Sequence, residues 1–218
     1  MLPPVLLILG TDLAGKDHFA NVLTDAAAAT GMSVERRRGL LSARPDHRRT
    51  SEGKGLMNLW MEWTFLATLP FHCRFLPYLV SLLLWIDIKR FRPPASGSLL
   101  VVSHTPIRLL AFALGHLFDT IEEIKMPVVA EKVLRAVACE TKARTVVLDI
   151  HHDIRMERMR LRSQRGTGDY FDRYMSDDPI RSERIESFLV FIGVTYLGAV
   201  HIENNNLPDV ELLACLAK

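Results

Sequence analysis

The sequence predicts an α/β fold, a doubly wound parallel sheet of five strands with helices on both faces. Two features lead to this class. Continuous apolar runs, such as residues 5–9 and 98–103, are typical of parallel strands that are buried on both faces. These runs alternate along the chain with segments of helical periodicity. The length of 218 residues suits a single domain over 1–218 with one insertion.

The individual elements follow in chain order. Strands are predicted over residues 5–9, 32–37, 98–103, 143–150 and 198–203. Helices are predicted from the loop after the first strand to Gly31, from Pro106 onward, and over 127–139, 154–165 and 207–216. We expect Thr105, Asp153 and a residue near Asn206 to cap three of these helices, because short polar side chains favour the N-cap position.

The loop after the first strand carries the most specific motif of the chain. Residues 10–17 run GTDLAGKD and match the phosphate-binding pattern GxxxxGK[ST] except at the last position. In such a loop, backbone N–H groups, the helix dipole and the lysine all face a phosphate. Its place between a strand and a helix favours a P-loop NTPase-type fold over a helix start with an incidental lysine. We expect ATP to be bound by Gly10, Asp12, Leu13, Ala14, Gly15, Lys16, Asp17 and His18.

Asp17 stands where the pattern has a hydroxyl, and this substitution has two possible meanings. In working P-loop NTPases a neutral serine or threonine binds Mg²⁺ at this position. Asp17 is able to bind the ion directly or through water, but its negative charge would lie close to the phosphates. Either Mg²⁺ bridges the carboxylate and the phosphates, or nucleotide binding is weakened. Asp17 is therefore the predicted metal residue, with ATP and Mg²⁺ as the expected cofactors.

Charge and cysteine content limit the class of partner. The net charge of +2 is too small for general nucleic-acid binding, so anion recognition has to come from local clusters. The three cysteines, Cys73, Cys139 and Cys215, are widely spaced in apolar surroundings, which predicts buried thiols in a reducing compartment. The first apolar run leads straight into the glycine loop and resembles a strand more than a signal peptide. We therefore expect a cytoplasmic protein.

Two segments between the first helix and the third strand have unusual composition. Arginines crowd the region after the second strand, at positions 36, 37, 38, 44, 48 and 49, and form either a solvated basic face or a grip on an anionic acceptor. The stretch 56–88, within an acceptor-side segment of about 56–90, is strongly apolar and aromatic. We expect two core helices that break near Pro70; a dimer interface, an acceptor pocket or a peripheral membrane contact is the alternative. Its purest run, Leu76 to Ile88, is too short for an integral membrane span.

Ligands of doubly wound sheets bind beyond the carboxyl ends of the strands. Residues 11–17, 36–38, 103–105 and 149–153 are predicted to lie there, and His104 is either a loop residue or a base. His151, His152 and Asp153 do not favour a metal site, since adjacent side chains point apart. A basic helix with Arg158, Arg162 and Arg165 ends at Gly166, which is how a mobile lid over about 154–175 would be built. The alternative is a solvent-facing amphipathic helix.

Taken together, these residues resemble the thymidylate kinase family of P-loop nucleotide kinases over most of the chain. The resemblance rests on the loop at 10–17, on Glu35 to Gly39, on the strand-to-lid segment 148–166 and on the polar-aromatic stretch 169–171. Where that family has an aspartate-arginine-aromatic triplet, this chain has Ser103-His104-Thr105. The departure removes an acceptor-binding arginine, for which Arg108 is a possible substitute, so an acceptor other than thymidylate is implied.

Two functions follow as expectations. The first is an ATP-dependent phosphotransferase, with Lys16, Arg158, Arg162 and Arg165 as catalytic residues and a nucleotide or other small phosphorylated acceptor held by Arg37, His104 and Arg108. The second is a degenerate, noncatalytic nucleotide-binding protein that acts through its apolar surface, as a homodimer, an interaction module or a membrane-peripheral module. Asp17 and the altered triplet are the reasons for the second.

Overall fold

The structure is a computed structural model that describes residues 4–10, 13–43, 74–166, 174–205 and 207–214. Its centre is a five-stranded sheet in the order β2-β3-β1-β4-β5, and every neighbouring pair of strands is parallel. The strands are Val5–Gly10 (β1), Ser33–Arg38 (β2), Ser98–Ser103 (β3), Arg144–Asp149 (β4) and Val200–Glu203 (β5). The prediction of an α/β protein with a five-stranded parallel sheet is confirmed.

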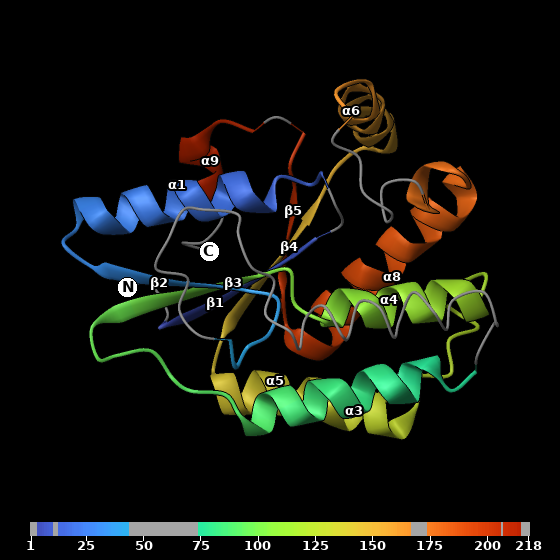
Figure 1. Cartoon of the computed structure of the whole chain (residues 1–218), viewed down its shortest axis with the longest axis horizontal. Helices are drawn as coiled ribbons and strands as arrows, with labels where there is room; N and C mark the ends of the chain where they lie inside the picture. The colour runs from blue at the N-terminus through green and yellow to red at the C-terminus, as the bar shows by residue number, and fades with distance from the viewer. Residues whose placement is uncertain (1–3, 11–12, 44–73, 167–173, 206, 215–218) are drawn as a thin grey trace.

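Helices cover both faces of this sheet (Figure 1). They are α1 (Lys16–Ala29), α3 (Leu76–Lys89), α4 (Ile107–Leu117), α5 (Val128–Thr141), α6 (His152–Gln164), α8 (Pro179–Leu197) and α9 (Asp209–Ala214). Alternate residues of β1 point to opposite sides: Leu6 and Ile8 join the core under α1 and α9, whereas Leu7 and Leu9 join the core on the other face. On that second face α4 and α8 contact the strands, and α3 and α5 pack on those helices.

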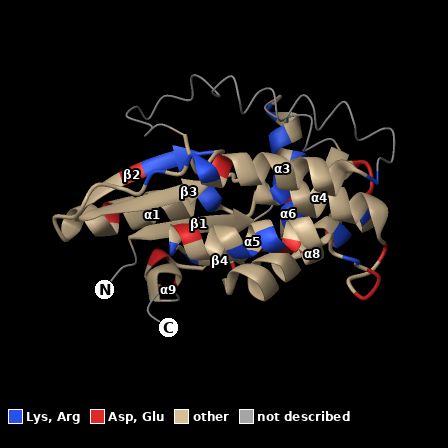
Figure 2. Ribbon diagram, turned by 90° about the horizontal axis from the view of Figure 1, so that it is seen from below, with Lys and Arg blue, Asp and Glu red and all other residues tan. Residues whose placement is uncertain are grey.

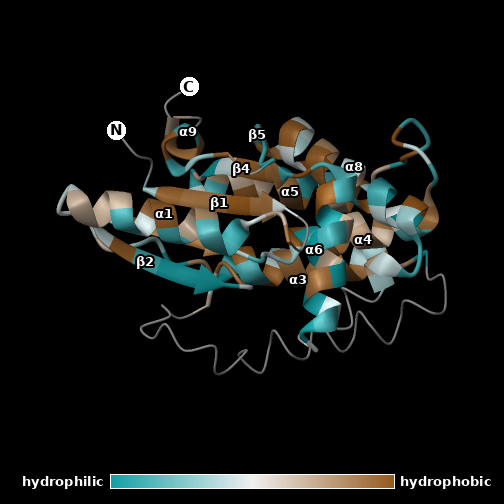
Figure 3. Cartoon of the chain, turned by 90° about the horizontal axis from the view of Figure 1, so that it is seen from above, coloured by the Kyte–Doolittle hydropathy of each residue, from teal (hydrophilic) through white to brown (hydrophobic). Residues whose placement is uncertain are grey.

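The central and edge strands differ in polarity as their positions require. All six residues of β1 are buried, and the strand is hydrophobic along its length in Figure 3. Most of the edge strand β2 is hydrophilic in the same view, and its arginines are coloured blue on the ribbon in Figure 2. Strand periodicity turns Arg37 into the core, where it is buried, and turns Arg36 and Arg38 toward α1.

Helix α8, the longest of the helices in the described ranges, was not among the predicted elements. Its ends nevertheless carry strong sequence signals. The Asp178 side chain caps the helix by accepting from the Arg181 N–H, Pro179 occupies the first turn, and Gly198 ends the helix in the left-handed conformation. The helix packs against α4, β4 and β1 and therefore completes the core on the second face.

Several local predictions were wrong. Pro106 holds the N-cap position of α4, and the buried Thr105 hydroxyl has no hydrogen-bond partner among the described residues. Helix α6 begins one residue before Asp153, which lies in its first turn instead of capping it. Helix α9 begins at Asp209, and residue 206 lies outside the described part. The thiol of Cys139 is exposed, contrary to the expected buried state, and Cys73 and Cys215 lie outside the described residues.

The apolar segment is described only in part, because Pro70 and residues 56–73 lie outside the described ranges. Its described helix, α3, packs one side on α4 and α5 and exposes the other. Among the helices of the described ranges, none has the length and hydrophobicity needed to cross a bilayer.

Candidate functional site

The site lies where neighbouring strands send the chain to opposite faces of the sheet. Strands β1 and β3 are adjacent, yet β1 leads to α1 on one face and β3 leads to α4 on the other. Loops that diverge in this way leave room between them at the carboxyl ends of the strands, which is the usual ligand site of such sheets. The loop from Gly10 to Asp17 and the corner Ser103-His104-Thr105 flank this point.

Both glycines of the motif are required by the geometry of the loop. A side chain at Gly10 would come within 2.7 Å of the Leu148 carbonyl oxygen, and its φ of 147° also favours glycine. Gly15 is the N-cap of α1 with φ 86°, and a Cβ there would lie 2.5 Å from the Asn204 side-chain nitrogen. Because a glycine cap supplies no side chain, the positive end of the α1 dipole faces the loop. Asp12 lies outside the described residues.

Lys16 crosses this loop. It is the first residue of α1, its side chain is only 4% exposed, and its Nζ donates to the Gly10 carbonyl at 2.8 Å. An ammonium group held inside a glycine loop at a helix N-terminus is the arrangement that anion binding requires. The loop lysine predicted from the motif is therefore positioned by the fold at the site.

Two distant segments hold the loop from outside. Arg158, on α6, donates from Nη1 to the Leu13 carbonyl at 2.7 Å, so one of the three predicted lid arginines contacts the loop. Asn204, after β5, donates from Nδ2 to the Ala14 carbonyl at 2.9 Å, and its backbone N–H donates to the Asp149 carbonyl at 2.6 Å. Asn204 was missed by the sequence analysis; its signal is the run of asparagines directly after the last predicted strand.

The other two lid arginines extend away from this contact. Arg162, one turn further along α6, is half-buried, and Arg165 is exposed at the C-cap of the helix. Gly166 follows in the left-handed conformation with φ 66°, as a helix-ending glycine should. The remainder of the predicted lid, residues 167–173, lies outside the described ranges.

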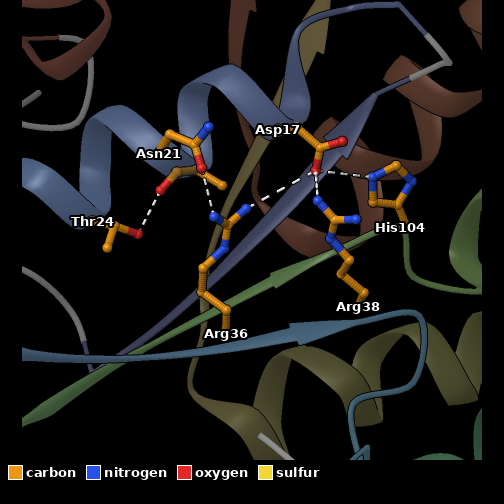
Figure 4. Close-up of polar contacts among 7 residues, drawn as sticks. Asp17, Asn21, Thr24, Arg36, Arg38 and His104 are labelled. Carbon is orange, nitrogen blue, oxygen red and sulfur yellow. Dashed lines mark hydrogen bonds and ion pairs between the residues drawn. The ribbon is translucent and has the colours of Figure 1, made fainter. Parts of the chain in front are cut away.

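Asp17 is the centre of a basic cluster, in which its carboxylate points toward Arg38 and His104 (Figure 4). Its Oδ1 accepts from Arg38 Nη2 at 3.0 Å and lies 3.4 Å from His104 Nε2 and 4.0 Å from Arg36 Nη2. The hydrogen bond with His104, helped by the nearby charges of Arg38 and Lys16, lowers the pKa of Asp17 to about 2, although burial opposes the shift. Asp17 is therefore ionised at neutral pH, and neighbouring cations neutralise it.

His104 comes from the β3–α4 corner and adopts a positive φ of 59°, which directs its ring toward α1. Burial is the main cause that lowers the pKa of His104; the charges of Lys16 and Arg108 add to this, and Asp17 opposes it. The ring is neutral at pH 7. When it donates its Nε2 proton to Asp17, Nδ1 is left as an acceptor at the edge of the site.

The predicted acceptor residues separate into two groups. His104 lies in the cluster, and Arg108 is close enough to affect its pKa. Arg37 does not lie there: its Nη2 is 2.6 Å from Glu35 Oε1, its Nη1 donates to the Leu41 carbonyl, and its side chain is buried. The alternation of side chains along β2 places Arg37 in the core and Arg38 beside Asp17, so an acceptor role for Arg37 finds no support in its position.

Other predicted or overlooked residues have local roles. His18 is exposed on α1, with Nε2 2.9 Å from Asp209 Oδ1 on α9. The described residues contain no group of three His, Cys, Asp or Glu side chains that could hold a metal ion. The contacts of Asp17 with Arg38 and His104 all use Oδ1, so coordination of Mg²⁺ by Asp17, through Oδ2 or through water, stays a prediction.

A buried ion pair, which the sequence analysis overlooked, anchors α6. Arg155 is 1% exposed and pairs through Nη1 with Oε1 of Glu186 on α8. Its Nη2 lies 3.4 Å from His152 Nδ1, at the start of the same helix. Arg155 precedes Arg158 by one turn, so this pair fixes the helix that delivers Arg158 to the loop.

Comparison of the chain with models of known protein families found no match, and comparison with curated proteins found no significant match either. The fold and the loop together define the class: an α/β protein with an all-parallel sheet and a glycine loop at the carboxyl end of its central strand.

Proposed function

We propose that the protein is an ATP-dependent phosphotransferase of the thymidylate kinase-like type, with a P-loop NTPase-type fold, which transfers a phosphoryl group to a nucleotide or another small phosphorylated acceptor. One observation carries the proposal. The buried ammonium of Lys16 lies 2.8 Å from the carbonyl of Gly10, across a glycine loop at the N-terminus of α1. Backbone N–H groups, a helix dipole and a lysine together suit the phosphates of a nucleotide.

The surrounding residues suggest the role of each group. Lys16 and the start of α1 would hold the donor phosphates, while Arg158 would approach the transferring phosphoryl group from α6, with Arg162 and Arg165 further along that helix. Phosphoryl transfer needs positioning and charge neutralisation more than covalent chemistry. Mg²⁺ would enter on the nucleotide phosphates and neutralise part of their charge.

The acceptor side would be formed by the cluster around Asp17. Arg38 and His104 contact the Asp17 carboxylate, and Arg108 lies close by. The neutral ring of His104 has an acceptor nitrogen for a hydroxyl or phosphate proton. Arg38 takes the role first expected of Arg37, whose guanidinium is committed to the core.

A second function is favoured by the state of Asp17. Its carboxylate makes two hydrogen bonds to basic groups in place of the hydroxyl that the motif normally offers to Mg²⁺. A chain with this arrangement would bind a nucleotide or another anion without turnover and act through its apolar surface. Mg²⁺-dependent turnover of ATP with any acceptor would exclude this alternative.

The test compares Lys16→Ala with Lys132→Ala, a matched change at an exposed lysine of α5. Melting temperatures are measured with ATP, ADP and inorganic phosphate, with and without Mg²⁺. A ligand that binds only the folded chain raises the melting temperature. We expect ATP to stabilise the native chain and Lys132→Ala equally and to lose its effect on Lys16→Ala. Equal stabilisation of all three proteins would refute the assignment of Lys16.

Asp17→Thr separates the two functions. If the native carboxylate has replaced a working ligand, restoring the hydroxyl should tighten nucleotide binding and leave turnover absent. If the native chain is catalytic, the same change should lower turnover, because it releases Arg38 and His104 from their common partner.

A further inference from the structure

Helix α3 is apolar around its whole circumference, yet this chain covers only half of it. Leu76, Val80, Leu84 and Ile88 are buried against the core. Large apolar side chains on the helix or at its N-cap are between 37% and 75% exposed, at Phe75, Tyr78, Leu82, Trp85 and Ile86. A helix that is hydrophobic on all sides is normally covered on all sides. The exposed half is therefore a surface that calls for a partner.

The exposed residues form one continuous stripe. Positions 75, 78, 82 and 85 follow one another at steps of three or four residues, and 86 lies four residues after 82, so all five side chains lie on one side of the helix. The buried positions 76, 80, 84 and 88 follow the same spacing on the opposite side. Helix α3 lies in the outer layer of the molecule beside α5, and its buried side packs on α4 and α5 (Figure 1), so the stripe on its opposite side faces away from the core.

Within residues 74–92 the exposed charges all have the same sign. Exposed basic residues flank it at Arg74, Lys89, Arg90 and Arg92. Asp87 is the one acidic residue between positions 74 and 92, and it is buried, where it accepts from the backbone N–H groups of Leu41 and Ser42. No carboxylate is therefore exposed along the helix to balance these four cations.

The end of the stripe shows how the apolar and basic groups combine. The Lys89 ammonium lies over the Trp85 ring, 4.6 Å from its centroid. A lysine whose stem follows an apolar surface and whose charge lies at its margin suits the boundary between hydrocarbon and charged headgroups. Tryptophan and tyrosine also favour that boundary, since each combines an apolar ring with a polar atom.

From this surface we infer that α3 docks the protein on anionic phospholipid membranes, with the stripe inserted among the headgroups and the four basic residues on the lipid phosphates and carboxylates. Apolar side chains and a basic margin are the two components that such binding requires. A second copy of the chain suits the face less well, because two such faces would bring basic residues together without a compensating acid. The inference does not depend on phosphoryl transfer.

The experiment is co-sedimentation of the whole chain with phosphatidylcholine vesicles, with and without phosphatidylserine. We expect binding to the anionic vesicles that weakens as salt rises. Leu82→Gln/Trp85→Gln removes apolar contact with the membrane. Lys89→Glu/Arg90→Glu reverses two charges, and each lost basic residue should lower the affinity for anionic vesicles about fivefold. Each pair should weaken binding at least tenfold. All these positions are exposed, so the variants should keep the far-UV circular dichroism of the native chain.

The control variants make the same kinds of substitution at exposed positions on other helices. Val194→Gln changes an exposed apolar residue of α8, and Lys132→Glu an exposed basic residue of α5, and both should bind vesicles like the native chain. Equal binding to neutral and anionic vesicles, unchanged binding by the α3 variants, or a dimer that the apolar α3 variant dissociates while no vesicles are bound would each overturn the inference. The vesicle assay contains no nucleotide, so a lack of vesicle binding would refute the membrane inference without bearing on the proposed phosphotransferase function.

Discussion

The buried pair of Arg155 and Glu186 offers a sharp test, because its two halves respond differently to the loss of their partner. Arg155 is 1% exposed and stays charged at any pH of interest. Glu186→Leu leaves that charge without its carboxylate, and breaking a buried pair in this way costs about 3–5 kcal/mol of unfolding free energy. For a chain of this length we expect the melting temperature to fall by roughly 6–20 °C.

For the opposite change, Arg155→Met, the pH limits how much unfolding free energy is lost. Arg155→Met removes the partner of Glu186, but a carboxyl group is able to take up a proton and become neutral. Neutralising it costs about 1.36 kcal/mol for each pH unit above its ordinary pKa of about 4.3, so the loss is at most about 3.7 kcal/mol at pH 7 and about 1 kcal/mol at pH 5. The cost of Arg155→Met should therefore shrink on acidification, whereas that of Glu186→Leu should not.

Urea denaturation of the native chain, both single variants and the double variant at pH 7 and pH 5 measures these costs. Arg155→Met/Glu186→Leu replaces the pair by apolar groups of similar size and should lie within about 1 kcal/mol of the native chain. Glu157→Gln, which breaks an exposed pair with Arg160 on the same helix, should leave the free energy of unfolding nearly unchanged, because water screens the pair. A cost of under about 1 kcal/mol for Glu186→Leu, or a double variant as unstable as it, would refute the reasoning.

Three further predictions concern the loop and its neighbours. Asp17→Asn should destabilise the chain at pH 7: the pKa shift from 3.8 to about 2 corresponds to about 2.4 kcal/mol, which half exposure of the side chain reduces to about 1 kcal/mol. Because the pKa of Asp17 is lowered on folding, its stabilising effect is complete above pH 3.8 and disappears as the pH falls through about 2. The difference in unfolding free energy between the native chain and Asp17→Asn should therefore shrink from pH 6 to pH 3, and urea titrations in which it stays constant would contradict the prediction. Gly15→Ala should cost at least about 1 kcal/mol more than Gly31→Ala, since both have positive φ but only the first meets a neighbouring side chain; equal losses in thermal denaturation would disprove the close approach. Arg158→Met should weaken ATP binding or turnover roughly tenfold or more while Arg160→Met leaves both unchanged, and calorimetry with similar affinities for the two would remove Arg158 from the site.

The central strands and the glycine loop were predictable because local pattern determines them. Strand β1 is buried on both faces, so its sequence is apolar without interruption, and the strained turn that follows needs glycine at positions 10 and 15. The apolar run is visible in the six residues of β1, and the glycine pattern in the eight residues 10–17. Lys16 follows from the same motif, and the structure buries it at the expected place.

The cluster around Asp17 was less predictable, because it depends on the direction in which single side chains point. A run of three arginines in β2 shows that a cationic surface lies nearby, but the register of the strand decides that Arg37 enters the core. The contact of Asp17 with His104 joins residues 87 positions apart. No spacing rule within the sequence predicts such a pair, although both residues were expected at the carboxyl ends of strands.

Helix α8 and the buried ion pair differ in how far the sequence indicates them. Asp178, Pro179 and Gly198 mark both ends of α8 by their residue types. The partner of Arg155 is different, because Glu186 lies on another helix and its burial follows only from the packing of α6 against α8. A charged residue in a basic helix is expected to face water, and tertiary packing overrides that expectation here.

The bond between Lys16 and Gly10 determines the state in which the proposed phosphate site would meet a ligand. The ammonium gives up its water when the chain folds, and the carbonyl of Gly10 replaces part of that hydration. Because an ammonium has three N–H donors, a phosphate at this loop would share the lysine with the Gly10 carbonyl and would not have to displace it. Much of the cost of dehydrating the cation is therefore met by folding, before any ligand arrives. Lys16→Met should retain anions less well and be no more resistant to heat than the native chain, because the Gly10 carbonyl loses this donor.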